Sequence, residues 1–305
     1  MNDQFTDHNE LTCVINVKNG EDFIRYSIDS AINQSIPIDI LVVDNLSTDK
    51  TVDIVKEYPE VRLVVTPTSN GLGHARNFSL QHVHTKYVCW LDADDKWCPD
   101  FCERSLKVLK DDMQLKLVSS STVLIDPHGI PLPEKDQRLA SNNNLPYLVE
   151  GDTIEKISQQ LRCKASWQSY VFLTEEVKKV GGFNTKYRFA PDLDLVSRVI
   201  LSGKAAHINS NLSYCRIHPN QMTSTFPPEE RYNESKEIVH HALDNTGNQC
   251  ELTKDDISRI VMFRIRLAYF LEQNSIIEGI KAMAMMLDPR LASWTLKRYL
   301  SRNEY

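Results

Sequence analysis

The sequence has no long apolar runs, and this absence excludes one large class of protein. No stretch reaches the roughly 18 consecutive apolar residues of a membrane span. The closest candidate, residues 260–271, is interrupted by Arg264 and Arg266. The first ten residues are polar and acidic, and they have neither the basic start nor the apolar middle of a secretory signal. We therefore expect neither a membrane span nor a secretory signal.

The sequence also lacks clusters of basic residues and pairs of cysteines. Its formal net charge is −6, and no run of Lys and Arg could meet the phosphates of a nucleic acid, which is therefore not an expected partner. The seven cysteines are scattered, and an odd number of them fits a reducing cytoplasm better than a disulfide framework. Cys98 and Cys102 allow a zinc site as an alternative, but no second pair lies at finger spacing.

The first hundred residues carry an alternating pattern of strands and helices. With 305 residues, 41% of them hydrophobic, the chain can bury a sizeable core. Short β-branched runs at 11–17, 38–43, 61–65 and 87–91 read as buried parallel strands. Between them, helices are expected at 21–34 and at 47–56, the second capped by Ser47 or Thr48. This order predicts an α/β fold with a mostly parallel sheet flanked by helices.

The rest of the chain is expected to form a second half of the same domain and a helical extension. A strand is predicted at 119–126, a surface loop at 127–144, and helices at 151–161, 174–180 and 191–202, the last ending at Gly203. Further helices are expected at 229–244, 254–273, 275–287 and 289–302. We predict one α/β domain over 1–225, with a first half at about 10–100 and a second at about 101–225, and an all-helical extension over 226–305.

Polar clusters follow three of the predicted strands at their carboxyl ends. Ligands of open parallel sheets bind beyond these ends, where the strand order reverses. Asp92 and Asp94 face the same side of an extended segment, and two such carboxylates can hold a hard divalent cation. For an isolated pair of this kind, capping or solvating a loop is the commoner role. The other two clusters, Asn16 with Asn19 and Asp44 with Asn45, are predicted to converge on the same crevice.

Two further segments carry candidate chemistry. The glycine-rich turn from Gly71 enters a helix and could cradle an anion, with Arg76 one turn further along. A dinucleotide site is disfavoured there, because the turn follows the third strand and lacks a small residue at its sixth position. Asp192 and Asp194 lie near the start of a predicted helix, where either could be a cap, or Asp192 a general base.

Several ordered segments of residues 11–224 together resemble the family 2 glycosyltransferases with the GT-A fold. The matching segments are VINVKNGEDF, SAINQS, VVDNLSTDKT, GLGHARN, LDADD, GGFN, PDLDLVSR and YCRIHPNQMTS. The resemblance implies a transferase that moves a sugar from a nucleotide-sugar donor, most simply a UDP-sugar, to a sugar or lipid-linked sugar acceptor. It also implies Mg²⁺ or Mn²⁺ as cofactor, inversion at the anomeric carbon, and a part in surface polysaccharide or glycoconjugate synthesis. By the same resemblance, 1–225 is a catalytic domain with a nucleotide-sugar half at about 10–100 and an acceptor half at about 101–225.

The resemblance also assigns roles to individual residues. Asp192 is the expected general base, and Asp94 and His218 are the expected metal ligands. The nucleotide-binding set is Asn16, Asn19, Asp44, Asn45, Arg76 and Asp92. Two residues depart from the family pattern: Asn45 stands where a second Asp is common, which leaves the base less defined, and Pro191 replaces a Glu.

Other functions remain open at this point. A sugar nucleotidyltransferase is disfavoured because the first turn, residues 16–20, lacks a phosphate loop rich in Gly and containing Arg. A binding module or degenerate relative without catalysis would not need Asp92, Asp94 and Asp192 together. The C-terminal helices could pack on the catalytic domain, form a homodimer or, through Met, Trp and basic residues at 283–302, contact the inner face of a membrane.

Overall fold

The computed structural model describes residues 9–133, 146–149 and 165–222, and residues 226, 227, 230, 233–235, 237, 238 and 241. Contacts divide the chain into two compact units, Met1–Phe226 and Pro227–Tyr305. The helices predicted at 151–161, 254–273, 275–287 and 289–302 lie outside the described residues, as do most of the 127–144 loop and much of the 229–244 helix. Within the described part, no helix has the length and apolarity that crossing a membrane requires.

The first unit alternates strands and helices along its first half, as expected. The elements of this half are β1 (Leu11–Val17), α1 (Ile24–Ile32), β2 (Asp39–Asp44), α2 (Thr51–Val55), β3 (Arg62–Val65), α3 (Leu72–Gln81), β4 (Tyr87–Trp90), β5 (Lys96–Trp97) and α4 (Phe101–Asp111). All four strand predictions for this half are confirmed to within one residue at each end. β1 pairs in parallel with both β2 and β4, and β2 pairs in parallel with β3.

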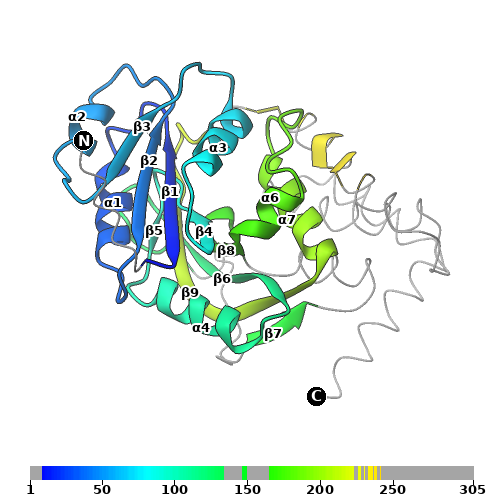
Figure 1. Cartoon of the computed structure of the whole chain (residues 1–305). Helices are drawn as coiled ribbons and strands as arrows, with labels where there is room; N and C mark the ends of the chain where they lie inside the picture. The colour runs from blue at the N-terminus through cyan, green and yellow to red at the C-terminus, as the bar shows by residue number, and fades with distance from the viewer. Residues whose placement is uncertain are drawn as a thin grey trace. The chain divides into compact units, whose positions relative to one another are not determined.

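The second half adds strands that run in both directions. Its elements are β6 (Leu115–Ile125), β7 (Pro146–Val149), the 3-10 turn η2 (Trp167–Ser169), β8 (Tyr170–Leu173), α6 (Thr174–Lys179), α7 (Pro191–Ser202) and β9 (Lys204–Arg216). The sheet order is β3-β2-β1-β4-β8-β6-β9-β5, and β7 also pairs with β9. β8 is antiparallel to both of its neighbours, β4 and β6. The sheet is therefore mixed: β3, β2, β1 and β4 form one parallel part, and β6 and β9 pair in parallel on the other side of β8 (Figure 1).

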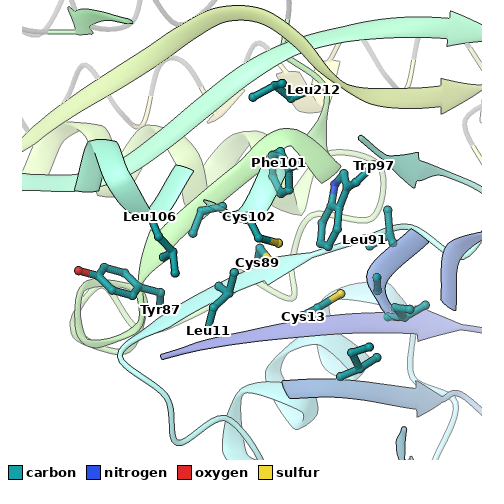
Figure 2. Packing of buried hydrophobic residues seen from close by; sticks show 14 of the residues in the cluster. Leu11, Cys13, Tyr87, Cys89, Leu91, Trp97, Phe101, Cys102, Leu106 and Leu212 are labelled. Carbon is teal, nitrogen blue, oxygen red and sulfur yellow. The ribbon is translucent and has the colours of Figure 1, made fainter. Parts of the chain in front are cut away.

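Helices cover both faces of the sheet, and each face has its own core. Successive residues of a strand face opposite sides, so Cys13 and Ile15 pack with one set of helices and Val14 with the other. The first core lies beneath α1, α2 and α4, where Figure 2 shows Phe101, Cys102 and Leu106 of α4 facing β1 and β4. The second lies beneath α3, α6 and α7.

The helix α7 begins and ends where its sequence directs. Pro191 occupies the first turn, where its missing N–H leaves no hydrogen bond unmade, and Gly203 follows the last residue. The helix buries Leu195, Val196 and Val199 against the second core. Full burial of one such side chain stabilises a fold by about 1.5–3 kcal/mol, so this face anchors the first turn of α7 to the sheet.

Candidate active site

The carboxyl ends of β1, β2 and β4 lie side by side, as predicted. The Asn45 N–H donates to the Val17 carbonyl at 2.8 Å, and the Leu91 N–H donates to the Val14 carbonyl at 2.9 Å. The hydrogen-bonded pairing of β1 with β2 and β4 therefore continues to the ends of the strands. The turn after β1 approaches closely, because a Cβ on Gly20 would lie 2.6 Å from Val17 Cγ2 and 3.7 Å from the Ala93 Cβ. A glycine at this position thus brings the β1 turn against the turn that carries Asp92 and Asp94.

Asn19 holds this turn to the loop after β2. It adopts a left-handed conformation with φ of 54°. Its Oδ1 accepts the Thr48 N–H at 2.8 Å, and its own N–H donates to Ser47 Oγ at 2.8 Å. The prediction that Ser47 or Thr48 caps a helix starting at residue 47 is wrong: both residues bond across to Asn19, and α2 begins only at Thr51. A nucleotide contact by Asn19 stays a prediction.

Three residues at the strand ends are those predicted to read the nucleotide base. Among the described residues, neither side-chain polar atom of Asn16 has a hydrogen-bond partner, and neither has Asp44 Oδ1. The other Asp44 oxygen accepts the Ser47 N–H at 3.0 Å. Asn45 Oδ1, by contrast, accepts the Thr66 hydroxyl at 3.0 Å. A buried polar group without a partner costs about 1–3 kcal/mol, so the atoms of Asn16 and Asp44 mark a place where a ligand would supply the missing bonds.

Arg76 sits in α3 and is almost fully buried. One of its nitrogens lies 3.2 Å from Asp92 Oδ1. Its guanidinium stacks 4.5 Å from the centre of the Trp167 ring and 5.5 Å from that of Phe183. Its Nε and one Nη have no partner among the described residues. Trp167 could not be predicted from the sequence, because neither its neighbours nor its spacing form a motif, and only the fold brings it against Arg76.

The carboxyl groups of Asp92, Asp94 and Asp192 come together although α7 is a hundred residues away in sequence. Burial raises the pKa of Asp92 to about 6; Arg76 lowers this pKa, whereas the nearby charges of Asp94 and Asp192 raise it further. Asp94 Oδ2 lies 2.9 Å from His218 Nε2. The Phe23 ring lies 4.8 Å from the His218 ring and covers one side of it. Repulsion among these carboxylates would be relieved by a cation placed between them.

Asp192 and Asp194 differ in their surroundings. Asp194 is buried and pairs with Arg198, whose guanidinium also donates to the carbonyls of Val180 at 2.5 Å and Gly182 at 2.7 Å. Asp192 Oδ1 accepts the N–H of Leu193 at 2.9 Å, and its side chain is only partly buried. Asp194 therefore holds α7 to the Gly181–Gly182 corner, while Asp192 lies near enough to Asp92 to raise the pKa of that carboxyl.

The described residues contain no ready-made group of three or more His, Cys, Asp or Glu that could hold a metal ion by themselves. Asp94 and His218 thus offer a partial set of ligands, as in sites that share a cation with phosphate oxygens. Cys98 and Cys102 are both free thiols, the second fully buried.

One open cavity of about 480 Å³ lies away from the site, at the opposite ends of the strands. It is lined by residues of α4, β4, β6, β8, α6 and the segments before β4 and β6, namely Thr85, Lys86, Tyr87, Leu109, Met113, Leu115, Leu173, Thr174, Glu175 and Lys178. None of the predicted site residues contributes to its walls, so its size carries no weight in assigning the function.

Comparison with known proteins finds similarity to glycosyltransferases. Residues 12–148 match the family model described as glycosyl transferase family 2. An uncharacterized glycosyltransferase of Rickettsia typhi is 26% identical over 296 residues, which span 92% of this chain and 86% of that protein. Hyaluronan synthase of Pasteurella multocida is 26% identical over 273 residues; these are 86% of this chain but only 26% of that protein.

Two solved structures share the fold at low sequence identity. TarS of S. aureus, residues 1–349 in complex with UDP-GlcNAc, has a TM-score of 0.67 at 17% identity, covering 91% of this chain and 79% of that one. The mannosyltransferase PcManGT of Pyrobaculum calidifontis, in complex with GDP-Man and Mn²⁺, has a TM-score of 0.58 at 18% identity, covering 95% of this chain and 84% of that one.

Proposed function

We propose that this chain is a family 2 glycosyltransferase with a GT-A fold, and that it transfers a sugar from a UDP-sugar to an acceptor hydroxyl with inversion and with Mn²⁺ or Mg²⁺ as cofactor. The observation that carries the proposal is the convergence of Asp92, Asp94 and Asp192, with His218 against Asp94, beside unpartnered polar atoms at the strand ends. A binding module would have no use for this excess of carboxylates.

The unpartnered atoms favour a uracil base. Asp44 Oδ1 is an acceptor without a donor, and uracil N3–H is a donor of the matching kind. The Asn16 amide supplies one donor and one acceptor for a neighbouring carbonyl or hydroxyl. Because Asn45 already accepts the Thr66 hydroxyl, we assign the reading of the base to Asp44 rather than to Asn45. Arg76, with two unpaired nitrogens beside Asp92, is placed to donate to the ribose or diphosphate.

The residues around Asp94 fit a divalent cation. Asp94 and His218 would hold it, with Asp92 on the ribose side of the same turn. When bound, the ion supplies positive charge that stabilises the leaving nucleotide diphosphate. The raised pKa of Asp92 supports this fit, because it reflects burial close to two other carboxylates without enough positive charge nearby. Manganese accompanies a nucleotide sugar in the PcManGT structure, which supports the same class of cofactor here.

Asp192 is assigned the general base. It would take the proton of the acceptor hydroxyl as that oxygen attacks the anomeric carbon from the face opposite the diphosphate, which gives inversion. Its place in the first turn of α7 favours the ionised carboxylate, because the helix N-terminus carries partial positive charge.

The acceptor is proposed to be a sugar or a lipid-linked sugar of a surface polysaccharide or glycoconjugate. The likeness to a hyaluronan synthase supports this class, although that protein is far longer than the match. The acceptor half would include β6 and α7 together with residues 134–145 and 150–164, which lie outside the described residues. The predicted packing, dimer or membrane roles of residues 242–305 also fall outside them and stay predictions.

A thermal-shift panel tests the donor site. We expect UDP with Mn²⁺ to raise the Tm of the wild type more than TDP, GDP or CMP with Mn²⁺, and more than UDP with EDTA. Asp94→Ala should lose the metal-dependent part of the shift and keep the shift with UDP alone. Asp53→Ala, on the exposed side of α2, serves as the matched control and should behave as wild type. No shift with any nucleotide would contradict the proposal and favour a degenerate, non-catalytic relative.

A further inference from the structure

Arg216, the last residue of β9, is a buried arginine that reaches three separate main-chain carbonyls. Its Nε donates to the Asp94 carbonyl at 2.7 Å, and one Nη donates to the carbonyls of Asp126 at 3.2 Å and Pro127 at 2.9 Å. Only 2% of its surface is exposed. The first carbonyl belongs to the turn after β4 that carries Asp92, Asp94 and Asp95, here called the acidic turn. The other two carbonyls belong to the turn that follows β6.

The main chain and ring contacts of Arg216 extend this connection. Its N–H donates to Asp95 Oδ1 at 2.7 Å, and the Asp95 carboxyl is itself buried. The guanidinium carbon lies 4.9 Å from the centre of the Phe23 ring and 5.1 Å from that of Tyr26. Phe23 also contacts the ring of His218, two residues beyond Arg216. Segment 216–218 therefore makes three hydrogen bonds to the acidic turn, with the Asp94 carbonyl, the Asp95 carboxyl and the Asp94 carboxyl.

Packing alone does not require an arginine at this position. Burying a cation is costly unless hydrogen bonds and nearby opposite charge compensate it. Here three carbonyl oxygens and two aromatic faces do so. A planar fork with several donors can bind carbonyls on two different turns at once, whereas a lysine ammonium is a single point of contact. Arg216 therefore makes a set of hydrogen bonds that a lysine at the same position could not make.

We propose that Arg216 is a positioning residue that sets the Asp94 carboxylate against His218 and links this pair to the turn at Asp126 and Pro127. The inference rests on the proposed metal-dependent donor site. Without the Arg216 guanidinium, the Asp94 carbonyl loses its only side-chain donor among the described residues. The Asp94 carboxylate can then rotate away from His218. Arg216 touches neither metal nor nucleotide in this account, so its loss weakens the metal-dependent part of donor binding.

Calorimetric titration with UDP, with and without Mn²⁺, tests this on the full chain. We expect Arg216→Lys to weaken binding of UDP in the presence of Mn²⁺ by about tenfold and binding of UDP alone by less than twofold. Arg104→Lys is the matched control: Arg104 also reaches β9, donating to Ser210 Oγ at 2.9 Å, but lies away from Asp94. It should leave both affinities within twofold. Phe23→Leu, which removes the ring shared by Arg216 and His218, should give a smaller loss of the same kind, about threefold.

The outcomes separate the two proposals. Full Mn²⁺-dependent affinity in Arg216→Lys, or an equal loss with and without Mn²⁺, would overturn the positioning role while leaving the donor site standing. If Arg216→Lys does not fold, Phe23→Leu decides: unchanged Mn²⁺-dependent affinity in it overturns the role, and a selective loss supports it. A wild type without any Mn²⁺-dependent UDP binding would overturn the proposed function, and this inference with it.

Discussion

Asp192 and Asp194 occupy the same first turn of α7 but differ in what their carboxylates contact. Asp194 is buried in an ion pair with Arg198, on the side of α7 that packs against the Gly181–Gly182 corner. Asp192 lies close enough to Asp92 to raise the pKa of that residue. The sequence alone placed both at a helix start, where capping and catalysis look alike, and only their partners separate the two roles.

Asp192→Asn is expected to abolish transfer while sparing donor binding. Asn is nearly the same size but cannot take the acceptor proton, and general bases typically contribute about 10²–10⁴-fold in rate. We expect release of UDP from the donor in the presence of acceptor to fall by at least 100-fold, with UDP–Mn²⁺ affinity within about threefold of wild type. Asp194→Asn should instead lower the free energy of unfolding. Loss of donor binding in Asp192→Asn would contradict its assignment as base.

At the scale of elements, α7 is held in place mainly by its buried face and by one arginine. Arg198 joins the side chain of Asp194 to the carbonyls of Val180 and Gly182, so α7 is tied to the corner between α6 and the following segment. Gly182 has φ of 70°, and a Cβ there would lie 2.6 Å from Asn77 Oδ1 of α3. The Gly181–Gly182 corner therefore packs against α3 and α7 together, and it fixes the position from which Asp192 enters the site.

Arg198→Met should destabilise the protein by about 3 kcal/mol. The change leaves the buried Asp194 carboxylate without its cation and removes the hydrogen bonds to two carbonyls. Urea denaturation of the wild type, Arg198→Met and the double variant Arg198→Met/Asp194→Leu would measure the effect. The double variant should be more stable than Arg198→Met, since it no longer buries an unpaired charge. A double variant less stable than the single one would contradict this account.

Elements differed in how well the sequence predicted them, for physical reasons. β1, β2 and β4 are buried on both faces, so they appear as continuous β-branched runs. β9 was missed because it carries Ser, Asn and His at buried positions, where hydrogen bonds across to β6 replace apolar packing. α2 starts later than expected because its apparent caps bond to Asn19. Local patterns cannot show such long-range partners.

At the scale of the whole molecule, the site is assembled by segments distant in sequence. The chain's motifs predicted Asp92, Asp94, Asp192 and His218 as candidate site residues, because each stands in an ordered series of family-like segments. Their proximity follows from the sheet order, which places β1, β2 and β4 together and returns β9 beside β6. Arg216 and Trp167 acquire their roles only through that folding, since the contact of Arg216 with Asp94 spans 122 residues of sequence and that of Trp167 with Arg76 spans 91.

The strand pair β6–β9, which carries Arg216 to the site, also contains a buried histidine that should make the fold sensitive to acid. His207 bonds to Ser119 at 2.8 Å and to Ser121 at 3.0 Å through its two ring nitrogens. Burial lowers the pKa of His207 to about 4. The unfolded chain, with a His pKa of about 6.5, therefore binds a proton that the folded state resists. The contribution of His207 to the free energy of unfolding is therefore fully present above pH 6.5, and it declines as the pH falls toward 4.

His207→Gln is expected to remove this part of the acid sensitivity. Between pH 7 and pH 4 the lowered pKa of His207 should reduce the free energy of unfolding by ~3 kcal/mol. A Gln side chain can keep a hydrogen bond to one of the two serines and does not titrate. Urea denaturation at pH 7, 5.5 and 4 should show a free energy of unfolding that falls less steeply in the variant, even if its stability at pH 7 is lower. His128→Gln, on the exposed turn after β6, is the matched control and should follow the wild-type profile. Parallel pH profiles for wild type and His207→Gln would mean that His207 is solvated or charged in the fold, and that the β6–β9 pair is not the acid-labile part of the domain.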